Sequence, residues 1–242
     1  MASNVSGIGK VAESVELGTR EVRELLSLFL KPSITQLGLF GGDWLKSQRE
    51  TQLAKTLAKA KAKLNAGELT INPVPLKLLK PIVEDCSLEE DEDMIERWAN
   101  LLAAAACGDP VLPTYVRLLA ELTPNEARLL DALQLLQQEP ANPRRGQFGG
   151  IPLGKVRAKT DLNPVEFRRI IINLIHLGLV FRILGTMTLL PSTIPKPFTD
   201  EDPIGMTLAA NDFLTVCSRP PAAAQNLGDA QKPGLHGDYQ GC

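Results

Sequence analysis

Six carboxylates lie close together between residues 89 and 96, and they are the side chains of this sequence that could most readily do chemistry. Five are consecutive, at 89–93, and the sixth is Glu96. Clustered carboxylates can hold a divalent cation or serve as general acid and base. Consecutive residues point around a helix rather than into one cage, and the glycine of a calcium loop is absent. A solvated helix N-terminus, where the macrodipole favours acidic side chains, is therefore the simpler interpretation.

The residues around this cluster predict the element that carries it. Ser87 is placed to cap a helix from Leu88 to Ala106, whose apolar stripe makes Trp98 a core or helix–helix interface residue. The acidic end could dock on a lysine-rich helix face, in the same chain or in a second copy. The residues singled out for such an interaction are Lys55, Lys59, Lys63, Glu89, Glu90, Asp91, Glu92 and Trp98.

The sequence has few of the residues and motifs that other kinds of catalytic site require. The chain has two histidines, and one of them, His236, lies near the end of the sequence. The stretch Ser6-Gly-Ile-Gly-Lys10 echoes a phosphate-binding loop but lacks the GxxxxGK[ST] pattern, and there is no GxSxG. We therefore expect a protein that is not an enzyme, with no cofactor, no metal and no small-molecule substrate.

A basic block between residues 144 and 182 has the chemistry of phosphate contact. Its elements read as a short helix at 152–160, a helix at 163–177 and a small β-hairpin of residues 179–183 and 187–190, in the order of a winged helix-turn-helix. Such a module can contact nucleic acid, but many winged helices dock proteins instead. The candidate nucleic-acid-binding residues are Arg157, Lys159, Arg168, Arg169 and Arg182.

The N-terminal part offers a membrane hypothesis. Residues 25–44 are more apolar than one helix stripe needs, and the basic run from Lys46 to Lys63 follows them. An apolar face beside a lysine-rich face is typical of helices that bind anionic lipid, but also of a buried helix hairpin or a dimer interface. Lys31, Pro32, Gln36 and Asp43 interrupt the run, so it falls short of the about 20 apolar residues that span a bilayer.

Composition and cysteine usage indicate an ordinary globular, cytoplasmic protein. The 242 residues are 44% hydrophobic and 22% charged, with a net charge of −2, which argues against nucleic acid as the dominant partner of the whole chain. The four cysteines show no CxxC spacing, and the N-terminus has no apolar run of signal-peptide length.

The helical periodicity predicts a mainly α protein with an N-terminal helical bundle followed by a winged-helix-like module with a small β-hairpin. We place the first domain at residues 1–121, the second at 122–218 and a disordered tail at 219–242. Thr123 and Asn163 are each followed directly by a proline and, two residues after it, by a glutamate, a pattern that predicts a helix start at both places. The predicted helices are 3–31, a new helix that begins at Pro32 and is interrupted at Gly41, 44–64, 76–84, 88–106, 113–121, 126–138, 152–160, 163–177 and 207–218.

Several of these motifs together resemble the bacterial abortive infection alpha family over roughly residues 20–218. The motifs are Gly42-Asp43-Trp44-Leu45, Leu78-Leu-Lys-Pro-Ile82, Ser87-Leu-Glu-Glu-Asp91 with Trp98-Ala-Asn-Leu-Leu102, and Leu122-Thr-Pro-Asn-Glu126. The resemblance implies a bacterial protein of phage defence by abortive infection, and it brings no catalytic residues. We therefore expect a non-enzymatic defence protein acting through a protein partner or self-association. The alternatives are a nucleic-acid-binding winged-helix protein and a membrane-directed effector.

Overall fold

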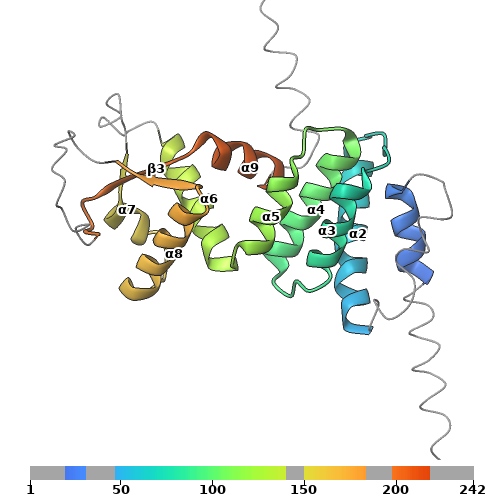
Figure 1. Cartoon of the computed structure of the whole chain (residues 1–242), viewed down its shortest axis with the longest axis horizontal. Helices are drawn as coiled ribbons and strands as arrows, with labels where there is room; N and C mark the ends of the chain where they lie inside the picture. Colours follow the sequence, from blue (N-terminus) through green and yellow to red (C-terminus); the bar gives the residue numbers. More distant parts are fainter. Residues whose placement is uncertain (1–19, 31–46, 140–149, 184–197, 219–242) are drawn as a thin grey trace, which may run out of the picture. The chain divides into compact units, whose positions relative to one another are not determined.

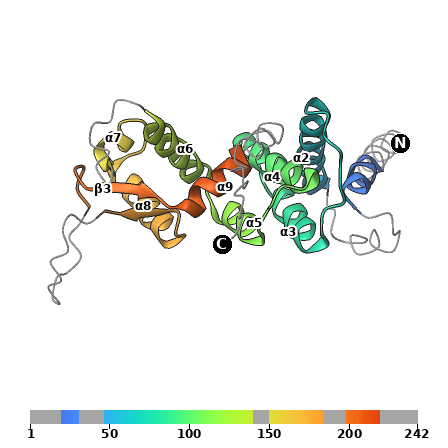
Figure 2. The same cartoon turned by 90° about the horizontal axis from the view of Figure 1, so that it is seen from above.

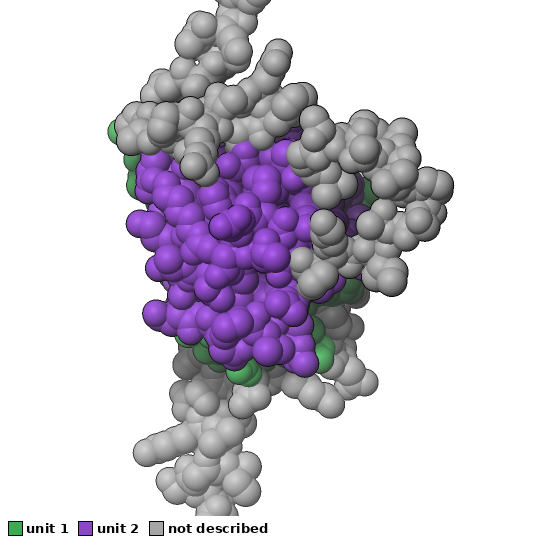
Figure 3. Space-filling model, turned by 90° about the vertical axis from the view of Figure 1, so that its left-hand side faces the viewer, with its two compact units in different colours: residues 1–90, 95–112, 218–242 green, residues 91–94, 113–217 purple. Residues whose placement is uncertain are grey.

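The computed structural model describes residues 20–30, 47–139, 150–183 and 198–218 and is mainly helical, with a small three-stranded antiparallel sheet (Figure 1). The chain divides into two compact units, coloured separately in Figure 3. Unit 1 contains residues 1–90, 95–112 and 218–242, and unit 2 contains residues 91–94 and 113–217. The predicted domain division after residue 121 stays a prediction.

Unit 1 is built from helices. A first helix covers residues 20–29, followed by α2 (Ser47–Ala66), α3 (Leu76–Cys86) and most of α4 (Glu92–Cys107). The predicted stripe of α2 is confirmed, since Leu53, Leu57, Ala60 and Leu64 are all buried. The segment after α2 is joined to the first helix by a hydrogen bond of 2.9 Å from the Val74 N–H to the Phe29 carbonyl.

The predicted start of the acidic helix is wrong. Ser87 does not cap it: the Ser87 hydroxyl donates to the Glu84 carbonyl (2.8 Å), and its N–H donates to the Val83 carbonyl, so Ser87 closes α3. Instead, α4 begins at Glu92, because a carboxylate oxygen of Asp91 accepts hydrogen bonds from the N–H groups of Asp93 (3.0 Å) and Met94 (3.2 Å).

Unit 2 combines helices with the small sheet (Figure 2). The strands lie in the order β1-β3-β2, both pairs antiparallel, with Val180 opposite Met206 and Ile151 opposite Ile204. Helix α6 packs against α7, α8 and β1, and α8 packs against β2. The elements are α5 (Pro113–Glu121), α6 (Pro124–Gln138), β1 (Ile151–Pro152), α7 (Leu153–Arg157), α8 (Pro164–His176), β2 (Val180–Arg182), β3 (Pro203–Met206) and α9 (Leu208–Ser218).

Local capping chemistry sets the starts of the two long helices of unit 2 as predicted. Thr123 forms a full capping box with Glu126 at the start of α6. Asn163 accepts hydrogen bonds from the N–H groups of Val165 (3.1 Å) and Glu166 (2.9 Å) at the start of α8. Gly178, at a φ of 70°, follows the end of α8. Helix α5 coincides with its predicted bounds.

The sheet differs from the predicted one in its partners. Strand β2 pairs with β3, which the sequence did not predict, and β1 lies where a loop ending at residue 151 was expected. The predicted helix at 152–160 is shorter, because β1 takes its first residue and α7 ends at Arg157. Several predicted segments lie outside the described residues: the strand 187–190, the helical residues 3–19, 31 and 44–46, the helix predicted to begin at Pro32, and the disordered tail at 219–242.

Candidate interaction surfaces

The lysine-rich face of α2 meets one carboxylate of α4. Lys59 Nζ lies 3.0 Å from Glu96 Oε2, and Lys63 Nζ forms an ion pair with the other carboxylate oxygen. Burial alone would raise the pKa of the Glu96 carboxyl, but the two lysine hydrogen bonds outweigh it and hold the pKa below its ordinary value. Lys55, on the same helix, is exposed. Lys59 and Lys63 of α2 therefore engage Glu96 of the carboxylate cluster.

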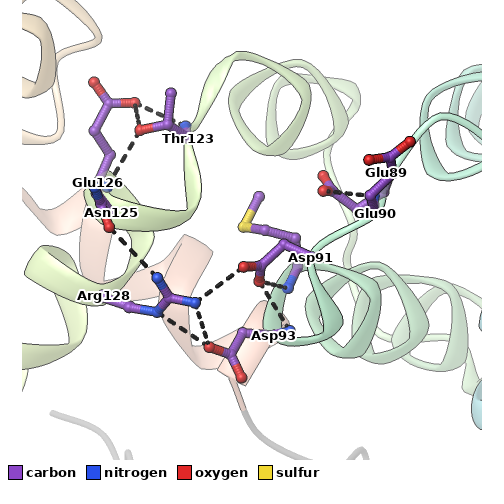
Figure 4. Close-up of polar contacts among 9 residues, drawn as sticks. Glu89, Glu90, Asp91, Asp93, Thr123, Asn125, Glu126 and Arg128 are labelled. Carbon is purple, nitrogen blue, oxygen red and sulfur yellow. Dashed lines mark hydrogen bonds and ion pairs between the residues drawn. The ribbon is translucent and has the colours of Figure 1, made fainter.

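Three further carboxylates of the cluster, at 91–93, belong to unit 2, and two of them, Asp91 and Asp93, surround Arg128 of α6 (Figure 4). The Arg128 guanidinium lies 3.0 Å from carboxylate oxygens of both Asp91 and Asp93. Glu89 accepts a hydrogen bond from the N–H of Glu90 (3.1 Å), and Glu92 is exposed in the first turn of α4. The cluster is thus distributed among different partners.

Trp98 lies in the core of unit 1, with an exposed fraction of 1%. Met94, Ile95, Leu101 and Leu102 of the same helix are also fully buried. Trp98 therefore stabilises the packing of α4, as its position in the apolar stripe predicted, and is covered by its own chain.

Helix α8 presents a surface of mixed chemistry. Phe167, Ile170, Ile171 and Leu174 are buried on its inner side. Its outer side, which we call the α8 face, consists of Val165, Arg168, Arg169, Ile172 and His176, all exposed. Within the described residues, Arg168 and Arg169 have no ion-pair partner. The α8 face therefore carries two unpaired positive charges between two exposed aliphatic side chains.

The other three candidate nucleic-acid-binding residues lie outside the α8 face. Arg157 forms an ion pair with Asp200 (2.5 Å), and Arg182 pairs with Asp202 (2.8 Å) while its guanidinium lies 4.9 Å above the Phe198 ring. Lys159 is exposed just after α7. Of the five predicted residues, only two, Arg168 and Arg169, thus share one helix face.

The candidate membrane segment is partly described. Val22, Leu25, Leu26, Phe29 and Leu30 are buried in unit 1, whereas residues 31–46, with Trp44, lie outside the described residues. Each helix in the described part of the chain is too short or too polar to cross a bilayer. Contact with a membrane surface stays a prediction.

Sites for small ligands are few among the described residues. Across residues 20–30, 47–139, 150–183 and 198–218, no group of three or more His, Cys, Asp or Glu side chains is arranged to hold a metal ion. A pocket of about 40 Å³ between α7 and α8, lined by Arg157, Phe167 and Asp200 among others, has room for a few water molecules only. A hollow of about 320 Å³ in unit 1 lies between Arg49, Gln52, Leu88 and Glu90.

The sequence analysis missed the polar network that holds α8 against α6. Glu126 is 4% exposed, and its carboxylate accepts hydrogen bonds from the Thr123 N–H (2.8 Å), the Thr123 hydroxyl (2.9 Å) and the Asn173 amide (2.8 Å). Asn125 donates to Glu166 (3.1 Å) across the same two helices. The capping signature at 123–126 identified the local bonds, but nothing in it pointed to a partner 47 residues away. This network fixes which side of α8 faces outward.

The family comparison identifies the class of protein. The model of the family described as abortive infection alpha matches residues 46–189, more than half of the chain. The chain therefore belongs to the abortive infection alpha family, which indicates a defence protein of the abortive-infection type. Searches of the curated proteins and of the solved structures find no match.

Proposed function

We propose that this chain is a non-enzymatic abortive-infection protein that acts by docking a protein through the α8 face. The observation that carries the proposal is the composition of that face. Val165 and Ile172 are 64% and 43% exposed, and they lie seven residues apart, about 10 Å along the helix. Arg168 and Arg169 lie between them.

This composition favours protein as the partner. Protein interfaces combine an apolar centre with arginine, which buries its long side chain well and forms strong pairs with carboxylates. A surface that contacts nucleic-acid phosphates usually carries lysine, arginine and small polar side chains. Exposed aliphatic side chains contribute little binding energy beside a charged phosphate backbone. An exposed valine and isoleucine on one helix stripe are better explained by an apolar partner surface.

The non-enzymatic part of the proposal is supported by the state of the described cysteines. Burial raises the pKa of the Cys86 thiol to about 12 and that of Cys107 to about 11. Both therefore stay protonated at neutral pH, and a thiol is a far weaker nucleophile than a thiolate. The carboxylates of Glu96, Asp200 and Asp202 are engaged in ion pairs.

A second candidate function, binding of nucleic acid, is favoured by the topology of unit 2. The order α6, β1, α7, α8, β2, β3, with β3 central in the sheet, is the order expected of a winged-helix module, in which α8 would be the recognition helix. Arg168, Arg169 and Lys159 would then contact phosphates.

Inducible expression in a bacterium tests the primary proposal. Host growth and phage yield per infected cell are scored with the wild-type chain and with an empty vector. We expect fewer progeny phage when the chain is present, at the cost of the infected host. Unchanged phage yield and unchanged growth would contradict the proposal.

A salt titration separates the two candidates. Binding of duplex DNA and of RNA is measured from low to high salt with the wild-type chain and with Arg168→Glu/Arg169→Glu. A docking protein shows no binding that depends on these arginines. Tight binding at low salt that weakens steeply with salt, and is lost in the double variant, would favour the nucleic-acid function.

A further inference from the structure

The end of α3 and the link to α4 form a second surface of mixed chemistry, opposite in charge to the α8 face. Leu88 is 58% exposed, and it lies among Asp85, Glu89 and Glu90. We call these four residues the acidic segment. In the described part of the chain Asp85 and Glu90 have no ion-pair partner, and Arg49, which lines the same hollow as Glu90, forms no ion pair with it.

A basic partner would lower the electrostatic energy of the acidic segment. Burial, and after it the neighbouring Glu84 carboxylate, raise the pKa of Asp85. The Glu84 carboxylate therefore adds repulsion to the effect of burial at Asp85. Arginines brought against the segment would remove that repulsion.

The α8 face matches the acidic segment in charge and in its exposed aliphatic side chains. If the two surfaces met, Arg168 and Arg169 would lie against carboxylates, and the aliphatic pair Val165 and Ile172 would lie against the exposed side chain of Leu88. The α8 face is a poor partner for itself, because Arg168 and Arg169 lie near the middle of α8 and twofold pairing would bring four guanidinium groups together. An acidic partner with one protruding aliphatic side chain fits it better.

We propose that the chains associate head to tail, with the acidic segment of one copy docked on the α8 face of a second copy. This inference rests on the proposed function, and it names the protein partner as the chain itself. Because the contact is heterologous, a dimer retains one unused acidic segment and one unused α8 face, so further copies can add. Association therefore grows with concentration and weakens with salt.

Sedimentation velocity of the full chain at low salt tests the proposal with two blocking variants. Arg168→Glu/Arg169→Glu removes the α8 face, and Leu88→Asn/Glu90→Gln removes the acidic segment without making it basic; all four side chains are exposed, so the fold is retained. We expect the wild type to form species larger than a dimer as its concentration rises. Each variant alone is expected to stay monomeric over this concentration range, because its dissociation constant for self-association should be at least tenfold larger than that of the wild type.

The decisive sample is the equimolar mixture of the two variants. One contributes the intact acidic segment and the other the intact α8 face, so a single contact forms and the mixture yields a 1:1 dimer and nothing larger. Lys61→Glu, at an exposed position of α2, is the control and should assemble like the wild type. A monomeric mixture, a wild type whose state is independent of concentration, or variants that assemble like the wild type would each overturn the proposal.

Phage yield with Arg168→Glu/Arg169→Glu separates this inference from the function beneath it. If the mixture stays monomeric while this variant loses protection against phage, self-association is wrong and the α8 face docks another protein. If the variant protects as well as the wild type, the proposed function itself is wrong, whatever the sedimentation result.

Discussion

Glu126 is the side chain on which the position of α8 depends most. Its buried carboxylate closes the capping box of α6 and accepts the Asn173 amide from α8. A buried carboxylate of this kind is stabilising only while its donors remain, and removal of the carboxylate leaves those donors without an acceptor. The outward orientation of Arg168 and Arg169 follows from this inward anchor.

We predict that Glu126→Ala lowers the free energy of unfolding by about 2–3 kcal/mol, because a cap and an interhelical hydrogen bond are lost together. Urea denaturation followed by circular dichroism measures it. Glu121→Ala, which removes one partner of a long 3.8 Å ion pair with Arg117, is the control and should cost less than about 0.5 kcal/mol. Equal effects of the two substitutions would contradict the anchoring role.

The Glu96 cluster predicts a stability change in acid. Because the folded pKa of Glu96 lies below its ordinary value, its ion pairs contribute stability that is present above the unfolded pKa and is lost as pH falls through the folded pKa. The thermal midpoint should therefore fall less between pH 6 and pH 3 in Glu96→Gln and in Lys63→Met than it falls in the wild type. Lys61→Met, an exposed lysine on the same helix, should keep the wild-type difference.

At the scale of elements, residues close in sequence were the ones that could be predicted. The starts of α6 and α8 follow from Thr123 and Asn163, because a cap and its N–H donors lie within three residues of each other. The start of α4 was mispredicted, because Ser87 and Asp91 are both capable caps; in the structure Ser87 closes α3, and Asp91 caps α4 while it also accepts a hydrogen bond from Arg128, 37 residues away. Local chemistry could not decide between them.

Strand β3 could not be predicted for a related reason. Its four residues include Pro203 and Gly205, both unfavourable in a strand, and show no alternation that would identify one. The pairing depends on contacts distant in sequence: a Cβ at Gly205 would lie 2.7 Å from the Phe181 ring of β2. The α8 face was likewise only partly foreseen, since the sequence placed its arginines but not the exposure of Ile172.

Helix ends provide a prediction at this scale. Gly178 after α8 and Glu68 after α2 both have positive φ, 70° and 52°, which glycine adopts without the strain of a side chain. Gly178→Ala should therefore lower the free energy of unfolding by about 1 kcal/mol, whereas Glu68→Gly should leave it equal or raise it slightly. Urea titrations of both variants measure the two signs. Destabilisation by Glu68→Gly comparable to that of Gly178→Ala would contradict this account.

At the scale of the whole molecule, a net charge of −2 conceals a division of charge between surfaces. Within unit 1 Lys59 and Lys63 of α2 are engaged by Glu96, and within unit 2 three arginines are engaged by aspartates, namely Arg128, Arg157 and Arg182. Arg168 and Arg169 differ, because they lie beside exposed aliphatic side chains and lack such partners in the described residues. This contrast is why we propose the α8 face as the docking surface of this defence protein.

The central claim, that the α8 face carries the defence function, is tested most directly by phage yield from hosts expressing Val165→Asp/Ile172→Asp. This change places two carboxylates in the proposed docking surface. Leu135→Asp is the matched control, because Leu135 of α6 is equally apolar and 67% exposed but lies outside the α8 face. We predict that the double variant restores phage yield to that of the empty vector while Leu135→Asp still protects. Protection by the double variant at the wild-type level, with the chain folded and present in equal amount, would contradict the account.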